Sequence, residues 1–346
     1  MTDQPMFAYV SCAGDKRIKV YALDSQNGDV RVLQDIAVPG EDGPSPSNMP
    51  LAFSPDGRRL YAAVRSPPYL STCFDVDPDS GLLTLRSSTR LLHPMAYIAV
   101  DASGRCLLCA SYKAGKIAVF PIGSDGDVAP LPGTLIDDQP KAHCILPGKR
   151  AGTVFATVLE HNKIVSWRLD TGAGLLMPGE RTDTVARPGS GPRHLTWHPA
   201  LDVLYAVNET AGSVDAYRCG EAGALQLLQT EALMPDGFAG NARAADIHVT
   251  KDGRFLYASV RSAETITGFA VDFATGRLSR LGCWQAGGSP RSFSLSPDGK
   301  WMIAALQDLG VADVYRVMDD GMLEKRSRFE TGGNPSWVEI TRGSAC

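Results

Sequence analysis

Short apolar runs separated by turn sequences repeat along the whole chain. Each unit contains a short strand, a turn of the Ser-Pro-Asp-Gly type, an apolar strand, a polar loop, a third strand and a Gly-Leu or Gly-Val turn into a fourth. No long segment shows the i, i+3, i+4, i+7 apolar spacing of an amphipathic helix. The pattern therefore predicts an all-β chain with very little helix. The clearest copies start at Met49, Pro94, Pro192, Arg243 and Pro290, and a degenerate copy starts at Lys141.

The spacing of the second strands identifies the kind of repeat. A period near 50 residues with four short strands per unit is typical of a β-propeller blade. The N-terminal copy lacks a first strand, whereas residues 334–342 form a first strand with nothing after it. We therefore predict a seven-bladed β-propeller of four-stranded antiparallel blades, a single domain over residues 1–346, closed by pairing of 334–342 with 6–11. We anchor the second strands 46 to 54 residues apart at Phe7, Tyr61, Leu108, Phe155, Tyr205, Tyr257 and Ile303.

Composition agrees with this fold and narrows the possible partners. The 35 glycines and 23 prolines are spread over the chain and leave little room for long helices. The 34 basic and 38 acidic side chains give a net charge of −4 without a basic tract, so we expect no nucleic-acid partner. No window approaches ~18 consecutive apolar residues, and we expect no membrane association.

The first residues and the cysteines bear on the compartment. The N-terminal sequence MTDQPMFAYV has neither the basic start nor the apolar stretch of a signal peptide, so we expect a cytoplasmic protein. Of eight scattered cysteines, only Cys106 and Cys109 form a Cys-x-x-Cys pair. They lie in a strand-like run, where residues three apart point to opposite faces. We interpret both as apolar core thiols rather than metal ligands or a disulfide.

The predicted blade register brings polar side chains to one end of the ring. In a propeller, the loops that enter the first strands and the loops between second and third strands open on the same face, and such loops commonly carry function. Five of the six histidines fall there, whereas the turns at the other end carry no such cluster. The entering loops contribute His93, His143, Arg193, His194, Asp246, His248, Arg291, Ser336 and Trp337. The other loops contribute Arg65, Ser111–Lys113, Glu160–Asn162, Asn208, Glu209, Arg261 and Gln307.

These residue types point to a small anionic ligand. Arginines such as Arg193, Arg261 and Arg291 bind carboxylate or phosphate through paired donors and stay charged when partly desolvated. His143 and Glu209 are candidates for general acid–base catalysis. No Ser or Cys stands in a nucleophile-elbow context, which disfavours covalent catalysis.

Other interpretations of the same residues remain open. Several neutral histidines with a carboxylate can hold a metal, although no His-x-His or His-Glu-x-x-His spacing supports that. Asp246 and His248 lie on one face of a strand and can instead brace adjacent blades by a side-chain hydrogen bond. The Pro-Arg pairs ending at Arg193 and Arg291 can be packing elements in which the arginine pairs with a nearby carboxylate. His198 is expected to cap a turn at the far end.

At these residues the sequence resembles the lactonase family of seven-bladed propellers, which includes bacterial 6-phosphogluconolactonases and fungal 3-carboxy-cis,cis-muconate cyclases. The resemblance covers essentially the whole chain. It implies a cytoplasmic enzyme that opens or closes a lactone ring without a metal or organic cofactor. The matching stretches are GPRHLTWHP from Gly191, YAVNE from Tyr205, AADIHVTKDGRFLYAS from Ala244, SPRSFSLSPDGK from Ser289 and GNPSWV from Gly333. The site proposed for the cyclases matches His143, Arg193, Arg261 and Glu209.

Our first hypothesis is hydrolysis of an anionic sugar lactone, 6-phosphogluconolactone before others, by a monomer or weak homo-oligomer. Glu209 or His143 would activate water, and Arg193 would stabilise the oxyanion. Arg261 and Arg291 would hold the phosphate or carboxylate. The alternatives are a lactonising cycloisomerase of a carboxymuconate and, from another class, a non-catalytic scaffold. Further substrate-binding candidates are His194, Asn208, Asp246 and His248.

Overall fold

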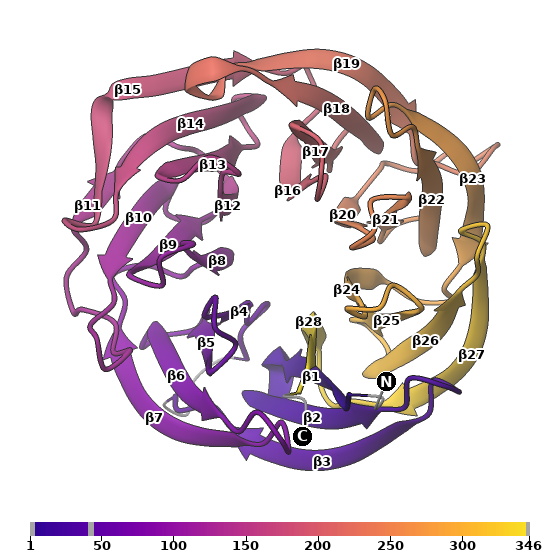
Figure 1. The fold of residues 1–346 in the computed structure, drawn as a ribbon, viewed down its shortest axis with the longest axis horizontal. Coiled ribbons are helices and arrows are strands. Elements are labelled where there is room, and N and C mark those ends of the chain that lie inside the picture. Colours follow the sequence, from indigo (N-terminus) through magenta and orange to yellow (C-terminus); the bar gives the residue numbers. More distant parts are fainter. Residues whose placement is uncertain (1–3, 41–44, 344–346) are drawn as a thin grey trace.

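The computed structural model describes residues 4–40 and 45–343, which form seven four-stranded antiparallel sheets arranged in a ring (Figure 1). The only helical segments among the described residues are two single 3₁₀ turns, η1 (Ala13–Asp15) and η2 (Glu221–Gly223). The predicted all-β, seven-bladed architecture is confirmed. Among the described residues no helix is long and apolar enough to cross a membrane.

The strands are given blade by blade, from the innermost to the outermost. Blade 1 contains β4 (Leu51–Phe53), β5 (Arg59–Val64), β6 (Leu70–Val76) and β7 (Leu83–Arg90). Blade 2 contains β8 (Tyr97–Val100), β9 (Cys106–Ser111), β10 (Lys116–Pro121) and β11 (Thr134–Ile136). Blade 3 contains β12 (Ala142–Pro147), β13 (Thr153–Val158), β14 (Lys163–Asp170) and β15 (Leu175–Val185).

The remaining blades follow the same order around the ring. Blade 4 contains β16 (Pro192–Trp197), β17 (Val203–Asn208), β18 (Ser213–Cys219) and β19 (Leu225–Ala232). Blade 5 contains β20 (Ala244–Val249), β21 (Phe255–Val260), β22 (Thr265–Val271) and β23 (Leu278–Gln285). Blade 6 contains β24 (Pro290–Leu295), β25 (Trp301–Leu306), β26 (Val311–Val317) and β27 (Leu323–Glu330). Blade 7 contains β28 (Pro335–Arg342), β1 (Met6–Cys12), β2 (Arg17–Leu23) and β3 (Val30–Ala37).

Blade 7 closes the ring as the sequence predicts. Its inner strand β28 comes from the C-terminal end of the chain and pairs antiparallel with β1, with Met6 opposite Arg342 and Val10 opposite Val338. The two ends of the chain therefore lie in the same blade, between blades 6 and 1 (Figure 1). This closure gives β1 a partner on both of its edges, which removes an exposed edge prone to aggregation.

All seven predicted second strands are present, but the register of the first differs from our anchor. Tyr61, Tyr205 and Tyr257 each donate a hydroxyl hydrogen bond to a glycine carbonyl in the outer turn of the following blade. In blade 7 the equivalent bond is made by Tyr9, to Gly81, over 2.9 Å. Tyr9 rather than Phe7 is thus the equivalent position. The two aromatic residues share one strand face, so the apolar alternation alone cannot separate them.

Apolar side chains fill the spaces between adjacent blades. The core consists of a series of buried clusters, each drawing residues from two neighbouring blades. Cys106 and Cys109 are buried in different clusters, as expected for opposite faces of β9. His198 caps the predicted far turn: its Nδ1 accepts from the backbone N–H groups of Ala200 and Leu201 at 3.1 and 2.9 Å. The blades are thereby fixed to one another, and the loops at their ends stand on a rigid frame.

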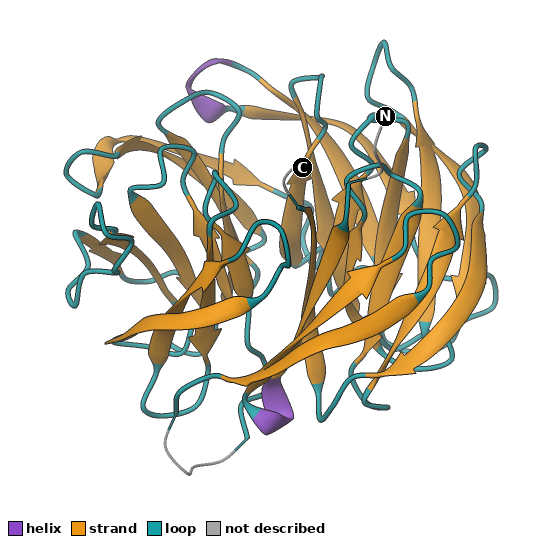
Figure 2. Cartoon of the chain, turned by 60° about the horizontal axis from the view of Figure 1, so that its bottom comes forward, coloured by secondary structure: helices purple, strands orange, loops and turns teal. Residues whose placement is uncertain are grey.

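The inner strands β4, β8, β12, β16, β20, β24 and β28 surround the central opening (Figure 1). Figure 2 shows the strands running between loops at their two ends. The loops that enter the inner strands share one end with the loops between second and third strands. We call this end of the ring the mouth, and the other end, which carries the Ser-Pro-Asp-Gly-type turns, the far face.

Candidate functional site

The inner strands of blades 3 to 6 are irregular at the positions of the candidate site residues. In β16, Pro192 pairs with Asn208 but His194 pairs with Val207, so Arg193 is an extra residue. Arg291 is the extra residue of β24 in the same way. A β-bulge bends a strand and re-aims its side chain. In β12 the pairing register shifts at His143 and Cys144. In β20 it shifts at Ala245 and Asp246.

Hydroxyl groups on the second strands satisfy the backbone at two of these bulges. The N–H of Cys144 donates to Thr157 Oγ1 over 3.1 Å, and the N–H of Asp246 donates to Ser259 Oγ over 3.0 Å. Thr157 and Ser259 are fully buried. A buried N–H without a hydrogen-bond partner destabilises the folded state. By accepting from these N–H groups, the two hydroxyls remove that penalty at the bulges.

Glu209 stands at the mouth between two arginines. Its Oε1 accepts from Arg261 Nη2 over 2.9 Å, and its Oε2 lies 3.1 Å from Arg193 Nε. The second contact is an ion pair without hydrogen-bond geometry, since Arg193 Nε has no hydrogen-bond partner in the part of the chain that the structure describes. Burial opposes ionisation of Glu209, but the charges of Arg193 and Arg261 outweigh it and lower the pKa of the carboxyl. Glu209 is therefore an anion at neutral pH, and its side chain is 23% exposed against 2% for Arg193.

Arg193 also reaches toward blade 5. Its Nη1 donates to the carbonyl of Ala245 and lies 3.1 Å from Nε2 of His194. Because a guanidinium only donates, His194 Nε2 accepts, and the ring carries its proton on Nδ1. That Nδ1 is 2.8 Å from Asp246 Oδ1. Burial, with Arg193 adding to it, lowers the pKa of His194 to about 4, so the ring is neutral.

Asp246 links three blades rather than pointing at the mouth. Its Oδ1 meets His194 of blade 4, and its Oδ2 accepts from the backbone N–H of Phe293 in blade 6 over 3.1 Å. His248 Nε2 lies 3.4 Å from the same Oδ2. Burial opposes its charge, but the two histidines outweigh this and hold the pKa of Asp246 well below its usual range. The bracing interpretation of Asp246 fits these contacts.

Asn208 and His248, both predicted to bind substrate, lie in different surroundings. Asn208 is fully buried, and its amide donates to Ser213 Oγ over 3.0 Å within blade 4. The His248 side chain is 38% exposed and packs edge-on against Phe293. Burial opposes its protonation, but Asp246 outweighs this and raises the pKa of His248. The structure brings His248 next to Asp246 and not next to Glu209.

His143 lies at the centre of the positive charge. It is buried, and its Nδ1 has no hydrogen-bond partner among the described residues. Its ring packs 5.1 Å from that of His194 and 5.6 Å from that of Tyr112. Burial, followed by the charges of Arg193, Arg291 and Arg65, holds the pKa of His143 well below its usual range. His143 is thus a neutral imidazole with a nitrogen available to accept a proton.

Two further arginines reach the mouth from blades 1 and 6. Arg291 Nη1 donates to Gln307 Oε1 over 3.3 Å. The guanidinium carbon of Arg65 lies 5.8 Å from the ring centroid of Tyr112. The blade register predicts Arg65 and Tyr112 at the mouth without a role for either. In the sequence only their loop positions indicate that they belong to the site. Their contact joins two different blades, so the sequence pattern does not show it.

Aromatic rings from three blades contact one another on the inner strands. Tyr97 of blade 2 packs edge-on against both His194 and Trp337, at 5.1 and 5.0 Å between centroids. Trp337 Nε1 donates to Glu339 Oε1 over 2.8 Å. Burial raises the pKa of Glu339 to about 7. We call Tyr97, His194 and Trp337 the aromatic layer.

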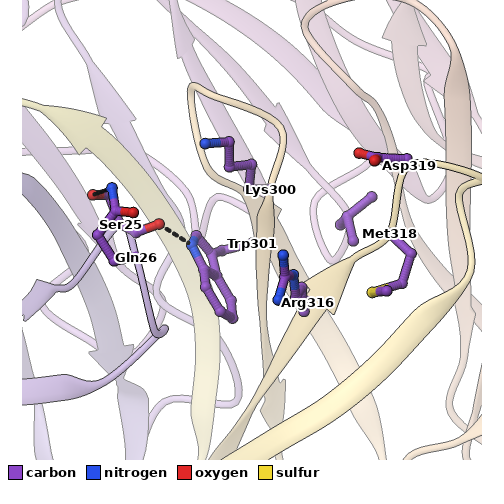
Figure 3. A pocket seen from close by; sticks show the side chains of 8 residues that line it. Ser25, Gln26, Lys300, Trp301, Arg316, Met318 and Asp319 are labelled. Carbon is purple, nitrogen blue, oxygen red and sulfur yellow. Dashed lines mark hydrogen bonds between the residues drawn. The ribbon is translucent and has the colours of Figure 1, made fainter. Parts of the chain in front are cut away.

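The described residues contain no group of three or more His, Cys, Asp or Glu placed to hold a metal ion. A cavity of about 160 Å³ lies on the far face between blades 6 and 7. There Trp301 Nε1 donates to the carbonyl of Ser25 over 2.9 Å, with Lys300 and Arg316 beside it (Figure 3). None of the candidate site residues lines this cavity, and its central hydrogen bond joins the two blades.

Comparison with known proteins gives one consistent result. A family model described as a lactonase with a seven-bladed β-propeller matches residues 6–340. A 6-phosphogluconolactonase of Yersinia pestis is 33% identical over 334 residues, covering 96% of this chain and 97% of that protein.

Solved structures agree with the sequence comparison. The periplasmic gluconolactonase of Pseudomonas aeruginosa is 26% identical, with a TM-score of 0.86 and 99% of each chain covered. A protein from Lactobacillus plantarum, 20% identical, has a TM-score of 0.85 over 98% of this chain and 100% of that one. The second likeness supports the fold alone.

Proposed function

The chain belongs to the lactonase family of seven-bladed β-propellers, and on that premise we propose that it hydrolyses 6-phosphogluconolactone to 6-phosphogluconate. The observation that carries the proposal is the charge at the mouth. Arg193 and Arg261 contact the carboxylate of Glu209, and Arg291 and Arg65 add their charges around the neutral imidazole of His143. Such an excess of guanidinium groups suits an anionic substrate, and a neutral imidazole suits proton transfer.

His143 is the better of the two candidate bases. Both oxygens of Glu209 are engaged by arginines, so protonating this carboxylate would give up two ion pairs. The ring of His143 makes no hydrogen bond within the described part of the chain, so no carboxylate or backbone group competes for its unprotonated nitrogen. In the proposed reaction His143 takes a proton from water as the water oxygen attacks the lactone carbonyl. The tetrahedral intermediate then expels the ring oxygen, which receives that proton and becomes the hydroxyl of the open acid.

The pair of arginines on Glu209 supplies the positive potential for this step. Two guanidiniums on one carboxylate leave a net positive charge at the mouth, and fixed positive charge stabilises a developing oxyanion. Arg193 is 2% exposed and is held by Ala245 and His194, so it acts from a fixed position. We accordingly treat Glu209 and Arg261 as positioning residues for the charge that faces the carbonyl.

The test is a substrate panel with the purified protein. Wild type is assayed, above the uncatalysed rate, with 6-phosphogluconolactone, glucono-δ-lactone and a carboxy-cis,cis-muconate. We expect the highest kcat/KM for 6-phosphogluconolactone. Cyclisation of the muconate without lactone hydrolysis would replace the proposal with the cycloisomerase, and inertness toward all three would refute both.

We propose the cytoplasm as the compartment. The seven cysteines among the described residues are all free thiols, as is usual in reducing compartments. The related gluconolactonase of Pseudomonas aeruginosa is periplasmic. Fractionation of the native host with an antibody to this protein decides between the two: recovery with periplasmic markers would overturn this assignment.

A further inference from the structure

Two of the arginines at the mouth contact a carboxylate of the described residues, and two do not. Glu209 neutralises part of the charge of Arg193 and Arg261. Neither Arg65 nor Arg291 forms an ion pair with any carboxylate in the described part of the chain. Two of these four guanidiniums are therefore without a carboxylate in direct contact among the described residues, and these two come from blades 1 and 6, which flank blade 7 in the ring (Figure 1).

Arg65 makes no hydrogen bond through its guanidinium within residues 4–40 and 45–343. It directly follows β5, and its Nε is buried without a hydrogen-bond partner among these residues. Its guanidinium lies 5.8 Å from the ring centroid of Tyr112, within the range of a cation–π contact. Tyr112 itself packs edge-on against His143. A ring face positions the guanidinium and leaves its N–H groups available for a ligand.

The guanidinium of Arg291 is oriented by hydrogen bonds to neutral amide side chains and not by a carboxylate. Its Nη1 donates to Gln307 Oε1 over 3.3 Å, and Gln307 Nε2 donates to Asn334 Oδ1 over 2.6 Å. Asn334 Nδ2 in turn donates to the carbonyl of Pro46 over 3.0 Å. This chain of amides orients Arg291 without offsetting its charge. Burial, with repulsion from Arg193, Arg261 and Arg65, holds the pKa of Arg291 well below its usual range.

Two cations kept near each other without an anion are unfavourable until a ligand of opposite charge arrives. We propose that Arg65 and Arg291 form an anion subsite that binds the phosphate of the substrate, with Tyr112 positioning Arg65. This inference rests on the proposed function and deepens it, because it assigns the phosphate to blades 1 and 6 and leaves Arg193 and Arg261 to Glu209. It replaces our sequence-based assignment of Arg261 to the phosphate.

The test compares one enzyme on two lactones that differ only in the phosphate. Arg65→Gln removes the charge and keeps a polar side chain, and Arg65→Lys keeps the charge without the planar fork. We expect KM for 6-phosphogluconolactone to rise at least tenfold in Arg65→Gln. The ratio of its kcat/KM for 6-phosphogluconolactone to that for glucono-δ-lactone should fall at least tenfold, with Arg65→Lys in between. Arg58→Gln, an exposed arginine of the far face, is the matched control and should keep the wild-type ratio.

A binding measurement separates this inference from the proposed function. Titration calorimetry with inorganic phosphate and with 6-phosphogluconate should show binding to wild type that weakens at least tenfold in Arg65→Gln and in Arg291→Gln. Wild type that binds both ligands but hydrolyses no lactone would refute the function and leave the subsite standing. An active enzyme whose Arg65→Gln variant keeps the wild-type ratio and phosphate affinity would refute the subsite alone.

Discussion

At the scale of single residues, the surrounding groups set different charge states and therefore different roles for His143 and Glu209. Glu209 lies between two guanidiniums and stays ionised, whereas His143 is buried among cations and stays neutral. A general base has to be deprotonated beforehand, and both groups are; the carboxylate is already paired with two guanidiniums whereas the imidazole is not, so the environment favours the imidazole. The residue types at the mouth could be predicted from the sequence. Their protonation could not, because it depends on which charges the bulged strands bring within reach.

The assignment of His143 as the base predicts both a rate and a pH profile. His143→Ala should lower kcat at least ~100-fold with a smaller change in KM. Because the base works when deprotonated and its pKa is held below 6.5, kcat/KM of wild type should stay level from pH 8 to below 6.5 before it falls. Glucono-δ-lactone is the substrate for this profile, since a phosphate titrates near pH ~6. An acidic limb above pH 6.5, or full turnover in His143→Ala, would contradict the assignment.

Glu339 predicts a pH-dependent stability of its own. Its folded pKa of about 7 lies above the ordinary value of 4.5, so between these values the folded protein holds a proton that the unfolded chain has lost. The contribution of protonated Glu339 to the stability of the fold is fully present below pH ~4.5 and is lost as the pH rises through 7. The free energy of unfolding of Glu339→Gln should therefore rise relative to that of wild type by about 1 kcal/mol or more as the pH increases from 5 to 8, and its Tm should rise with it. Equal Tm differences at pH 5 and pH 8 would show that Glu339 is not buried as a neutral acid.

At the scale of elements, repeated contacts hold the blades in register. Tyrosines of the second strands bond to the outer turns of the next blades, and hydroxyls such as Thr157 satisfy the bulged inner strands. The strand pattern predicted where each second strand lies. It did not predict the bulges or the Arg65–Tyr112 contact, since both depend on pairing between residues that are not periodic in the sequence. The shift from Phe7 to Tyr9 has the same origin.

The tyrosine contacts can be tested one at a time. Tyr205 is fully buried and donates to the carbonyl of Gly276 over 2.8 Å. Tyr205→Phe leaves that carbonyl without its donor, and we expect a loss of ~1–2 kcal/mol in the free energy of unfolding. Tyr69→Phe is the control, because the Tyr69 hydroxyl is partly exposed and has no hydrogen-bond partner in the described part of the chain. Urea denaturation of both variants measures the difference, and equal midpoints would refute the structural role of the bond.

At the scale of the whole molecule, the ring depends on a strand contributed by the opposite end of the chain. The incomplete copies at the two ends of the sequence predicted this closure, and β28 pairs with β1 accordingly. Closure also completes the site, since Asn334, just before β28, supports Gln307 and through it Arg291, and Trp337 of β28 belongs to the aromatic layer. The same feature therefore sustains both stability and the mouth.

Removing the closing strand should abolish most of the stability. A chain ending at Gly333 loses the buried side chains of Trp337, Val338 and Ile340, worth ~5 kcal/mol or more, a large part of the stability of a typical protein. We expect aggregation or a Tm lower by well over ~10 °C. A chain ending at Gly343 is the control and should melt as wild type does. An unchanged Tm after truncation at Gly333 would contradict the closure.

The claim that the arginine-rich mouth selects a phosphorylated lactone is tested most directly by one ratio in the wild-type protein. This is kcat/KM for 6-phosphogluconolactone divided by kcat/KM for glucono-δ-lactone, with both rates corrected for uncatalysed hydrolysis. Each charge-assisted guanidinium–phosphate contact is worth ~1.5–3 kcal/mol, and every 1.4 kcal/mol is about tenfold. Two such contacts predict a ratio of ~100 or more. A ratio near ~1 would show that the guanidiniums do not recognise the phosphate, and would contradict the account.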